Sequence, residues 1–135
     1  MEGRLTPYLM MNGNATEAIE FYRQVLGAEV LKIQTYGDLP MSFPTEVQKL
    51  VAHAMLKIGE SEMMFSDSPG RPVQDGNKVG VCISTRDAER TKEIYDALHN
   101  DGGTVVGPLE TVPFSPAFGS VRDKFGVTFT IVTQL

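Results

Sequence analysis

The chain has 135 residues, which fits one ordinary domain or two very small ones. Hydrophobic residues make up 41% and charged residues 21%, as in soluble globular proteins, and no apolar run approaches the ~20 residues of a membrane span. The net charge of −5 argues against a protein that binds the phosphates of nucleic acids. The single cysteine, Cys82, excludes an internal disulfide and a cysteine-based zinc cluster.

The N-terminal stretch carries no apolar segment of secretory length, so we expect a cytoplasmic protein with neither a membrane nor a nucleic-acid partner. Cys82 lies in an apolar run between Val81 and Ile83, which predicts a buried and inert thiol. The chain has two histidines, His53 and His99, and this count limits the metal chemistry available to it.

The first half of the chain alternates strand and helix signals. Residues 5–11 predict a strand, and apolar side chains at helical spacing predict a helix at 15–26. Gly27 suits the left-handed position that ends a helix, and 28–36 predicts a second strand. Residues 37–48 contain two prolines and little periodicity, which predicts a long loop.

Two strands follow at 50–58 and 62–66, joined by a turn at Gly59. Residues 68–76, rich in Gly, Pro, Asp and Ser, predict a linker. The second half then repeats the order of the first. We expect a strand at 78–85, a helix at 86–99, a strand at 104–106 interrupted by Gly107-Pro108, an irregular proline-rich segment at 111–118, and paired strands at 119–122 and 127–133.

The two predicted helices carry weak internal similarity, since a shift of 73 residues places Ala15 on Ala88 and Tyr22 on Tyr95. The order strand, helix, three strands occurs twice. We therefore predict an α+β fold of two βαβββ modules, at about 1–67 and 77–135, that form a single domain over 1–135. Modules of this size are too small to be stable alone, so we expect them to pack on each other or on a second chain.

Several short motifs resemble those of one protein group. They are Pro7-Tyr8-Leu9, Asn12-Gly13-Asn14-Ala15, Phe21-Tyr22, Leu26-Gly27-Ala28, His53-Ala54, Ser66-Asp67 and Asp123-Lys124-Phe125-Gly126-Val127. With them the chain resembles the vicinal oxygen chelate superfamily, which includes glyoxalase I, extradiol dioxygenases and bleomycin-resistance proteins. Within it the chain is similar to the PhnB-like branch, whose domain also carries the label 3-demethylubiquinone methyltransferase-like. The resemblance implies a glyoxalase-like fold with curved mixed sheets and flanking helices, and a homodimer.

The chain departs from this branch at two places. The branch commonly carries a Trp-Gly pair in the late loop, where this chain has Phe118-Gly119. It also often has Trp in the last strand, where this chain has Phe129. The part of a binding cavity formed by the late loop and the last strand is therefore expected to differ from that of the branch.

The resemblance also implies four positions for metal ligands, which in the superfamily's enzymes are His, Glu or Gln. They fall at Pro7, His53, Gly80 and Thr130, so His53 alone keeps a strong donor. A labile divalent ion needs at least three convergent donors. We therefore predict no cofactor, with His53 as the one candidate ligand if a divalent metal binds. His53 has two other interpretations: a polar group of a binding cavity, or a structural histidine bonded to a neighbour.

The function that we predict is the binding of a small molecule in a sheet-lined cavity without the usual metal site. Candidate lining residues are His53, Met64, Ser66, Phe114 and Phe118. One alternative is a metal-dependent lyase, isomerase or dioxygenase that uses His53, and another is a non-enzymatic dimeric assembly module. The sequence leaves open whether the protein is an enzyme. It lacks a Gly-rich strand–loop–helix motif for a nucleoside methyl donor, which argues against methyl transfer.

Overall fold

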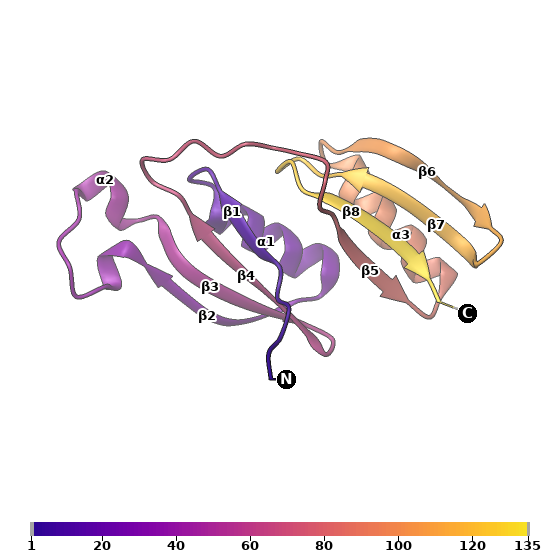
Figure 1. Ribbon diagram of the computed structural model, residues 1–135, viewed down its shortest axis with the longest axis horizontal. Coiled ribbons are helices and arrows are strands. Elements are labelled where there is room, and N and C mark those ends of the chain that lie inside the picture. Colours follow the sequence, from indigo (N-terminus) through magenta and orange to yellow (C-terminus); the bar gives the residue numbers. More distant parts are fainter. Residues whose placement is uncertain (1, 135) are drawn as a thin grey trace. The chain divides into compact units, whose positions relative to one another are not determined.

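The structure is a computed structural model, and it describes residues 2–134. The chain divides into two compact units, Met1–Gln74 and Asp75–Leu135. Each unit has one four-stranded mixed sheet and one long helix (Figure 1). The predicted order strand, helix, three strands is therefore present twice, and the α+β fold class is confirmed.

The first unit places its strands in the spatial order β1-β4-β3-β2. Strand β1 runs parallel to β4, and the other neighbours are antiparallel. The elements are β1 (Tyr8–Met11), α1 (Ala15–Leu26), β2 (Glu29–Thr35), the 3-10 helix η1 (Tyr36–Asp38), the short helix α2 (Thr45–Gln48), β3 (Val51–Ile58) and β4 (Ser61–Asp67).

The second unit repeats this arrangement with the order β5-β8-β7-β6, in which β5 runs parallel to β8. Its elements are β5 (Val81–Thr85), α3 (Ala88–Asn100), β6 (Thr104–Val112), β7 (Ser115–Arg122) and β8 (Thr128–Thr133). In both units the first strand therefore lies at a sheet edge, beside the last strand of its own unit.

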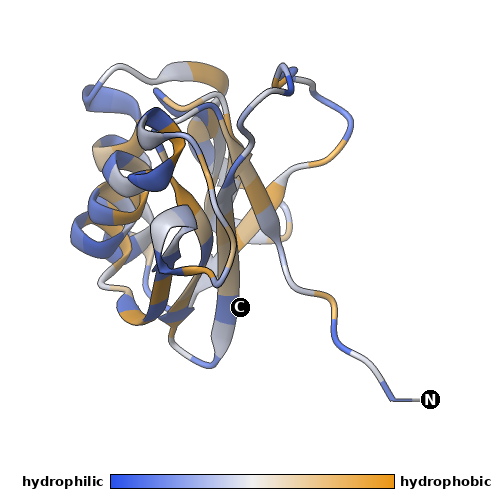
Figure 2. Cartoon of the chain, turned by 90° about the vertical axis from the view of Figure 1, so that its left-hand side faces the viewer, coloured by the Kyte–Doolittle hydropathy of each residue, from blue (hydrophilic) through white to orange (hydrophobic). Residues whose placement is uncertain are grey.

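Each helix covers one face of its own sheet. The core of the first unit contains Tyr22 of α1 together with Leu56 and Phe65, all three without solvent exposure. Helix α1 ends where predicted, because Gly27 takes the left-handed conformation with φ 65°. Figure 2 shows hydrophilic residues on the outer turns of the helices and hydrophobic residues along the strands, as burial of one helical face requires.

The core of the second unit is built in the same way. Leu98 of α3 packs in a core with Val121, Phe129 and Ile131, and all four are fully buried. Within residues 2–134 we find no helix that combines the length and the apolar character needed to cross a membrane.

Two segments differ from the sequence prediction. The predicted long loop at 37–48 contains the end of η1 and the whole of α2, so the segment is not a loop over its full length. Helix α2 has only four residues, and a single turn leaves too short a periodic pattern to be recognised.

The predicted irregular segment at 111–118 was also wrong. Strand β6 continues to Val112, and β7 begins at Ser115 after a two-residue turn. Pro108 does not interrupt β6, because β6 is an edge strand and the missing N–H of a proline costs no ladder bond on the open edge. The register between β6 and β7 shifts on both sides of Gly107, which absorbs the irregularity as bulges.

Candidate functional site

The first sheet has one face that α1 does not cover. Side chains alternate across a strand, and the buried Ala54, Leu56 and Phe65 point to α1. Their strand neighbours therefore point to the opposite face. We call the following five side chains of that face the open-face cluster: Tyr8, Met10, His53, Met55 and Met64.

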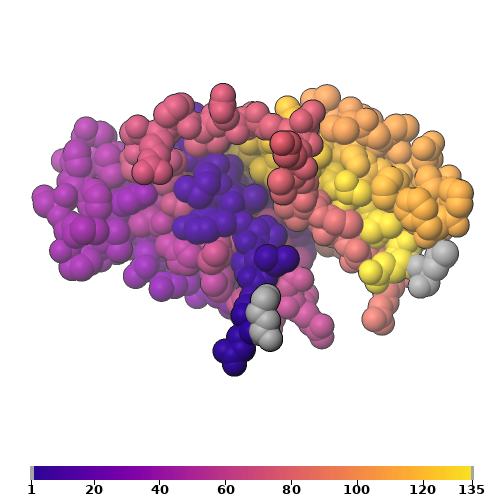
Figure 3. All heavy atoms as spheres, viewed as in Figure 1, coloured from indigo at the N-terminus to yellow at the C-terminus, as the bar shows by residue number. Residues whose placement is uncertain are grey.

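The strand register places the members of the open-face cluster next to one another. Met64 of β4 lies opposite Tyr8 of β1 on one side and opposite Met55 of β3 on the other. Tyr8 is 45% and Met10 is 47% exposed, so part of this apolar surface is open to solvent. The start of the chain, drawn in indigo, lies at the surface of the first unit in Figure 3.

His53 is half-buried on β3 and contacts Tyr8 from β1. The Tyr8 hydroxyl lies 3.5 Å from Nδ1 of His53, and the two rings meet edge to face with centroids 6.0 Å apart. Since β4 lies between β1 and β3, the Tyr8 side chain reaches across that strand. The contact uses Nδ1, so Nε2 is the ring nitrogen available to a ligand.

The strand that carries His53 is anchored by the end of β4. The carboxylate of Asp67, only 1% exposed, accepts hydrogen bonds from the backbone N–H of Val51 at 2.8 Å and of Ala15 at 3.0 Å. The hydroxyl of Ser66 donates to the carbonyl of Ala52 at 2.9 Å. The two residues immediately before His53 are therefore held by side chains of β4.

Ser66 and Asp67 both take part in this anchoring. The Ser66 hydroxyl bonds to the backbone and the residue is 5% exposed, and its place in the lining of a binding cavity stays a prediction. Asp67 was not among the predicted site residues, and it joins β4 to α1 and β3. A carboxylate at the end of an apolar strand, just before a linker, was the only signal that pointed to it.

The other two predicted site residues belong to the second unit. Phe114 lies in the turn between β6 and β7 and is 60% exposed, whereas Phe118 lies within β7 and is half-buried. Their rings meet edge to face with centroids 5.2 Å apart. The five predicted residues thus form two groups: His53, Met64 and Ser66 in the first sheet, and the two phenylalanines in the second.

The four positions that the resemblance implied for metal ligands can now be located. Pro7 precedes β1 and accepts a backbone hydrogen bond from Met64, and Gly80 directly precedes β5. The Thr130 hydroxyl of β8 is hydrogen-bonded to that of Ser120 at 2.9 Å. In the part of the chain that the structure describes, no group of three or more His, Cys, Asp or Glu side chains is placed to hold a metal ion. Of the side chains at these four positions, that of His53 is the one strong donor for a divalent ion.

Cys82 was predicted to be buried, and this was wrong. It is exposed, because its side chain points to the face of the second sheet that α3 does not cover. Its sulfur lies 4.0 Å from the Ser84 hydroxyl. The apolar run around Cys82 belongs to an edge strand with only one covered face, so alternation exposes every second residue.

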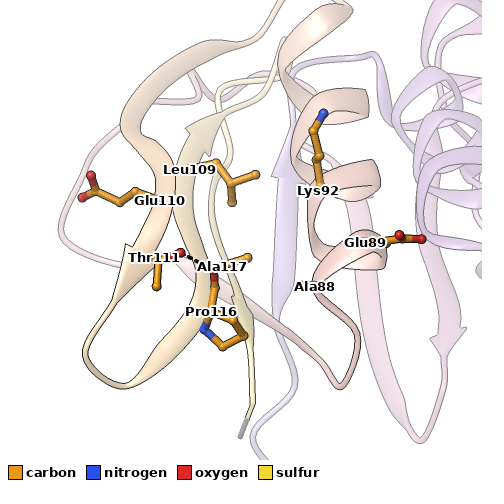
Figure 4. Close-up of a pocket in the computed structure, with 8 residues that line it drawn as sticks. All are labelled: Ala88, Glu89, Lys92, Leu109, Glu110, Thr111, Pro116 and Ala117. Atoms are coloured by element: carbon orange, nitrogen blue, oxygen red, sulfur yellow. Dashed lines mark hydrogen bonds between the residues drawn. The ribbon is translucent and has the colours of Figure 1, made fainter.

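A groove of about 340 Å³, which the sequence did not predict, lies in the second unit between the start of α3 and strands β6 and β7. Leu109 points into the groove, whereas the carboxylates of Glu89 and Glu110 point away from it (Figure 4). Lys92 at its rim donates to Asp96 at 2.6 Å, and this hydrogen bond raises the pKa of Lys92. The groove is therefore largely apolar, with its one lysine already paired.

Two βαβββ units, each with one helix on a four-stranded mixed sheet, define the glyoxalase-like fold of the vicinal oxygen chelate superfamily. The family model described as 3-demethylubiquinone-9 3-methyltransferase matches residues 3–132. The chain belongs to this family, the PhnB-like branch of the superfamily.

Individual relatives agree with this assignment. The chain is 30% identical over 137 residues to Protein YjdN of Escherichia coli strain K12, with 94% of this chain and 92% of the relative covered. The crystal structure of protein PA1353 from Pseudomonas aeruginosa matches with a TM-score of 0.88 at 28% identity, covering 98% of both chains. A PhnB protein from Bacillus cereus matches with a TM-score of 0.80 at 26% identity, covering 97% of this chain and 99% of the other.

Proposed function

We propose that this protein binds a small organic molecule on the open face of its first sheet, without the divalent metal site of the superfamily's enzymes. The observation that carries the proposal is the position of His53. Its Nε2 is available on a face that also presents Tyr8 and the thioethers of Met55 and Met64. One polar group within an adaptable apolar surface is the usual composition of a small-molecule site.

The side chains of the open-face cluster define the kind of ligand that fits. The methionines and the Tyr8 ring favour a flat apolar or aromatic body, because thioether sulfur makes favourable contacts with aromatic rings. His53 would fix the orientation of the molecule through one hydrogen bond. The participation of Phe114 and Phe118 in the same site stays a prediction.

A fragment screen by NMR, with ¹³C-methyl methionine labels, tests this proposal. A ligand of the predicted class should shift the methyl signals of Met55 and Met64. His53→Gln should lower its affinity by roughly tenfold, the scale of one lost hydrogen bond of about 1.4 kcal/mol. His99→Gln, in α3 of the second unit, is the matched control and should leave the affinity unchanged. A screen in which no compound shifts the signals of Met55 and Met64 would overturn the proposal.

A metal-dependent lyase, isomerase or dioxygenase is the second candidate, and the observation that favours it is His53 at a ligand position of the superfamily. Metal analysis of the purified protein separates the two functions. Stoichiometric zinc, nickel, manganese or iron, lost in His53→Gln, would support the enzyme. The family name alone gives no support to methyl transfer here, because the sequence lacks the Gly-rich motif for a nucleoside methyl donor.

The protein is proposed to act as a homodimer. Apolar side chains on both long edge strands support an interface: Leu31 and Ile33 on β2, and Val105 and Val106 on β6, are 41–60% exposed. Analytical ultracentrifugation at micromolar concentration should give a dimer, and a monomer would contradict this proposal. A dimer that binds neither an organic ligand nor a metal would instead favour the non-enzymatic assembly module.

A further inference from the structure

Ser66 lies on the open face of the first sheet, one residue before the end of β4, and its side chain is smaller than those of the open-face cluster. Its hydroxyl is turned to the backbone, where it donates to the carbonyls of Ala52 and Asp67. The residue is 5% exposed, so neighbouring side chains cover most of it. Larger side chains on three adjacent strands surround that position.

Two thioethers and one imidazole lie around Ser66. Met10 of β1 is its direct partner in the parallel ladder. Met64 lies two residues earlier on β4 and points to the same face. The antiparallel pairing of Ala54 with Phe65 places His53 of β3 on the other side of Ser66. Met10 and His53 each lie directly across from Ser66, where opposite Cβ atoms are about 4.5–5.5 Å apart. Met10 and His53 themselves lie two strands apart, roughly 9.5 Å, so their long side chains must converge over Ser66 to share one ion.

These donors carry no charge. Thioether sulfur is a soft ligand that selects Cu(I), and imidazole nitrogen binds copper among other metals, whereas Mg²⁺, Ca²⁺ and Mn²⁺ prefer carboxylate and carbonyl oxygen. The nearest carboxylate on the same face of β4 is that of Glu62, which forms an ion pair with Arg4 at 2.6 Å. A site of neutral ligands leaves the charge of the ion uncompensated, which penalises a divalent cation more than a monovalent one.

We propose that Met10, Met64 and His53 bind one soft monovalent cation, Cu(I), above Ser66. The site goes beyond the binding of an organic molecule and differs in its ligands from the divalent site of the superfamily. Tyr8 supports the imidazole from behind. With the proton on Nδ1, His53 donates to the Tyr8 oxygen and presents the Nε2 lone pair to the ion, the arrangement common to metal-bound histidines.

The site can be tested with Ag(I), which shares the ligand preferences of Cu(I) but is not oxidised in air. The experiment uses the full chain with Cys82→Ser, since the exposed thiol would bind the ion first. Chloride-free titration with silver nitrate is followed through ¹³C-methyl methionine signals. The methyl groups of Met10 and Met64 should shift together and reach saturation at one ion per chain.

Substitutions then assign the ligands. Met10→Leu combined with Met64→Leu keeps the apolar volume but removes both sulfurs. It should lower the Ag(I) affinity by roughly 10- to 100-fold or more, since supporting groups alone account for losses of that size. Tyr8→Phe should lower it by about tenfold. Two methionines serve as controls and should leave the affinity unchanged when replaced by leucine: Met63, buried on the opposite face of β4, and Met41, 62% exposed outside the sheet.

A Cu(I) competition with the chelator bicinchoninate completes the test, and the protein should withdraw one Cu(I) per chain. Two results would overturn the inference: parallel shifts of Met41, Met10 and Met64 without saturation, or equal affinity of the double variant and Met41→Leu. Both would indicate adventitious contact of the ion with surface sulfur. The Ag(I) titration contains no organic molecule, so its failure leaves the fragment screen unaffected.

Discussion

Asp67 joins three elements of the first unit: β4, α1 and β3. Its carboxylate is buried and accepts two backbone N–H groups, one from the first residue of α1 and one from the first residue of β3. A buried carboxylate with such partners holds the helix and the strand to the end of β4. The strand so held carries His53, which makes Asp67 a positioning residue for the proposed site.

Replacing Asp67 with Asn should destabilise the protein by about 2 kcal/mol, because the amide keeps one acceptor but turns an NH₂ group toward a backbone N–H. The free energy of unfolding, measured by urea titration, checks this value. Asp101→Asn is the matched control: its carboxylate is 65% exposed and pairs with Lys124, and such surface pairs contribute ~0–1 kcal/mol. Equal losses in the two variants would contradict the role given to Asp67.

Gly119 marks a close approach of α3 to β7. A Cβ placed there would lie 2.8 Å from the ring of Tyr95 and 3.0 Å from the Cα atom of Leu109. We expect Gly119→Ala to cost about 1–3 kcal/mol of stability, the usual range for overpacking. Gly107 lies in the neighbouring strand β6, where an added Cβ meets nothing closer than 3.8 Å. A thermal unfolding midpoint that falls equally for Gly119→Ala and Gly107→Ala would show that the contact with Tyr95 is not decisive.

At the scale of elements, each unit fixes the end of its last strand to neighbouring elements, but with different side-chain groups. The last residue of β4 is Asp67 and the last residue of β8 is Thr133, and each pairs with the last residue of the first strand in its unit. In the second unit, hydroxyl groups replace the carboxylate. Thr133 is hydrogen-bonded to Thr91 of α3 at 2.6 Å, and its carbonyl accepts from Ser115, the first residue of β7, at 2.7 Å.

This difference predicts the effect of removing one hydroxyl. Thr91→Val should cost about 1–3 kcal/mol, because the buried Thr91 hydroxyl bonds to both Thr85 and Thr133, and Thr133 then loses its partner. Thr128→Val is the matched control, since the Thr128 hydroxyl is buried and has no hydrogen-bond partner among residues 2–134. Its removal should leave the stability equal or higher. Chemical unfolding of both variants tests the pair, and a larger loss in Thr128→Val would refute the assignment.

The sequence allowed prediction of the elements but not of the side-chain network. The helix at 15–26 was correct to the residue. Its apolar periodicity distinguishes the buried face from the exposed face, and Gly27 marks its end. Strand β6 was missed beyond Val106, because Gly107-Pro108 resembles a stop signal and only the sheet order shows that this edge tolerates it. The hydrogen bond from Val51 to Asp67 joins positions 16 residues apart in sequence, and no local sequence pattern predicts such a partner.

The candidate site was predictable in part for the same reason. His53 and Met64 share a face because both lie in strands of correct register, which alternation made predictable. The burial of Cys82 was misjudged, since an apolar run does not show which strands lie at an edge with only one face covered. Tyr8 and Met10 were not predicted as site residues, because their place on this face depends on the parallel pairing of β1 with β4, more than 50 residues apart.

For the whole molecule, the question is whether the two units unfold together. Units of 74 and 61 residues lie in the size range where a domain buries only about 60% of its unfolded surface and is marginally stable. We therefore expect one cooperative transition for the full chain. The partners of Asp67 all belong to the first unit, and those of Thr91 to the second, so the two sites share no contact.

The double variant Asp67→Asn with Thr91→Val tests whether the two units unfold in one transition. With one transition, the loss in the double variant should equal the sum of the two single losses within about 0.5 kcal/mol, as for independent sites. Urea unfolding followed by circular dichroism and by methionine methyl signals of the first unit should give one midpoint. The methyl signals report only the first unit. If the units unfold separately, the midpoint of these signals will fall in Asp67→Asn and stay unchanged in Thr91→Val. That result would make each βαβββ unit an independent folding domain.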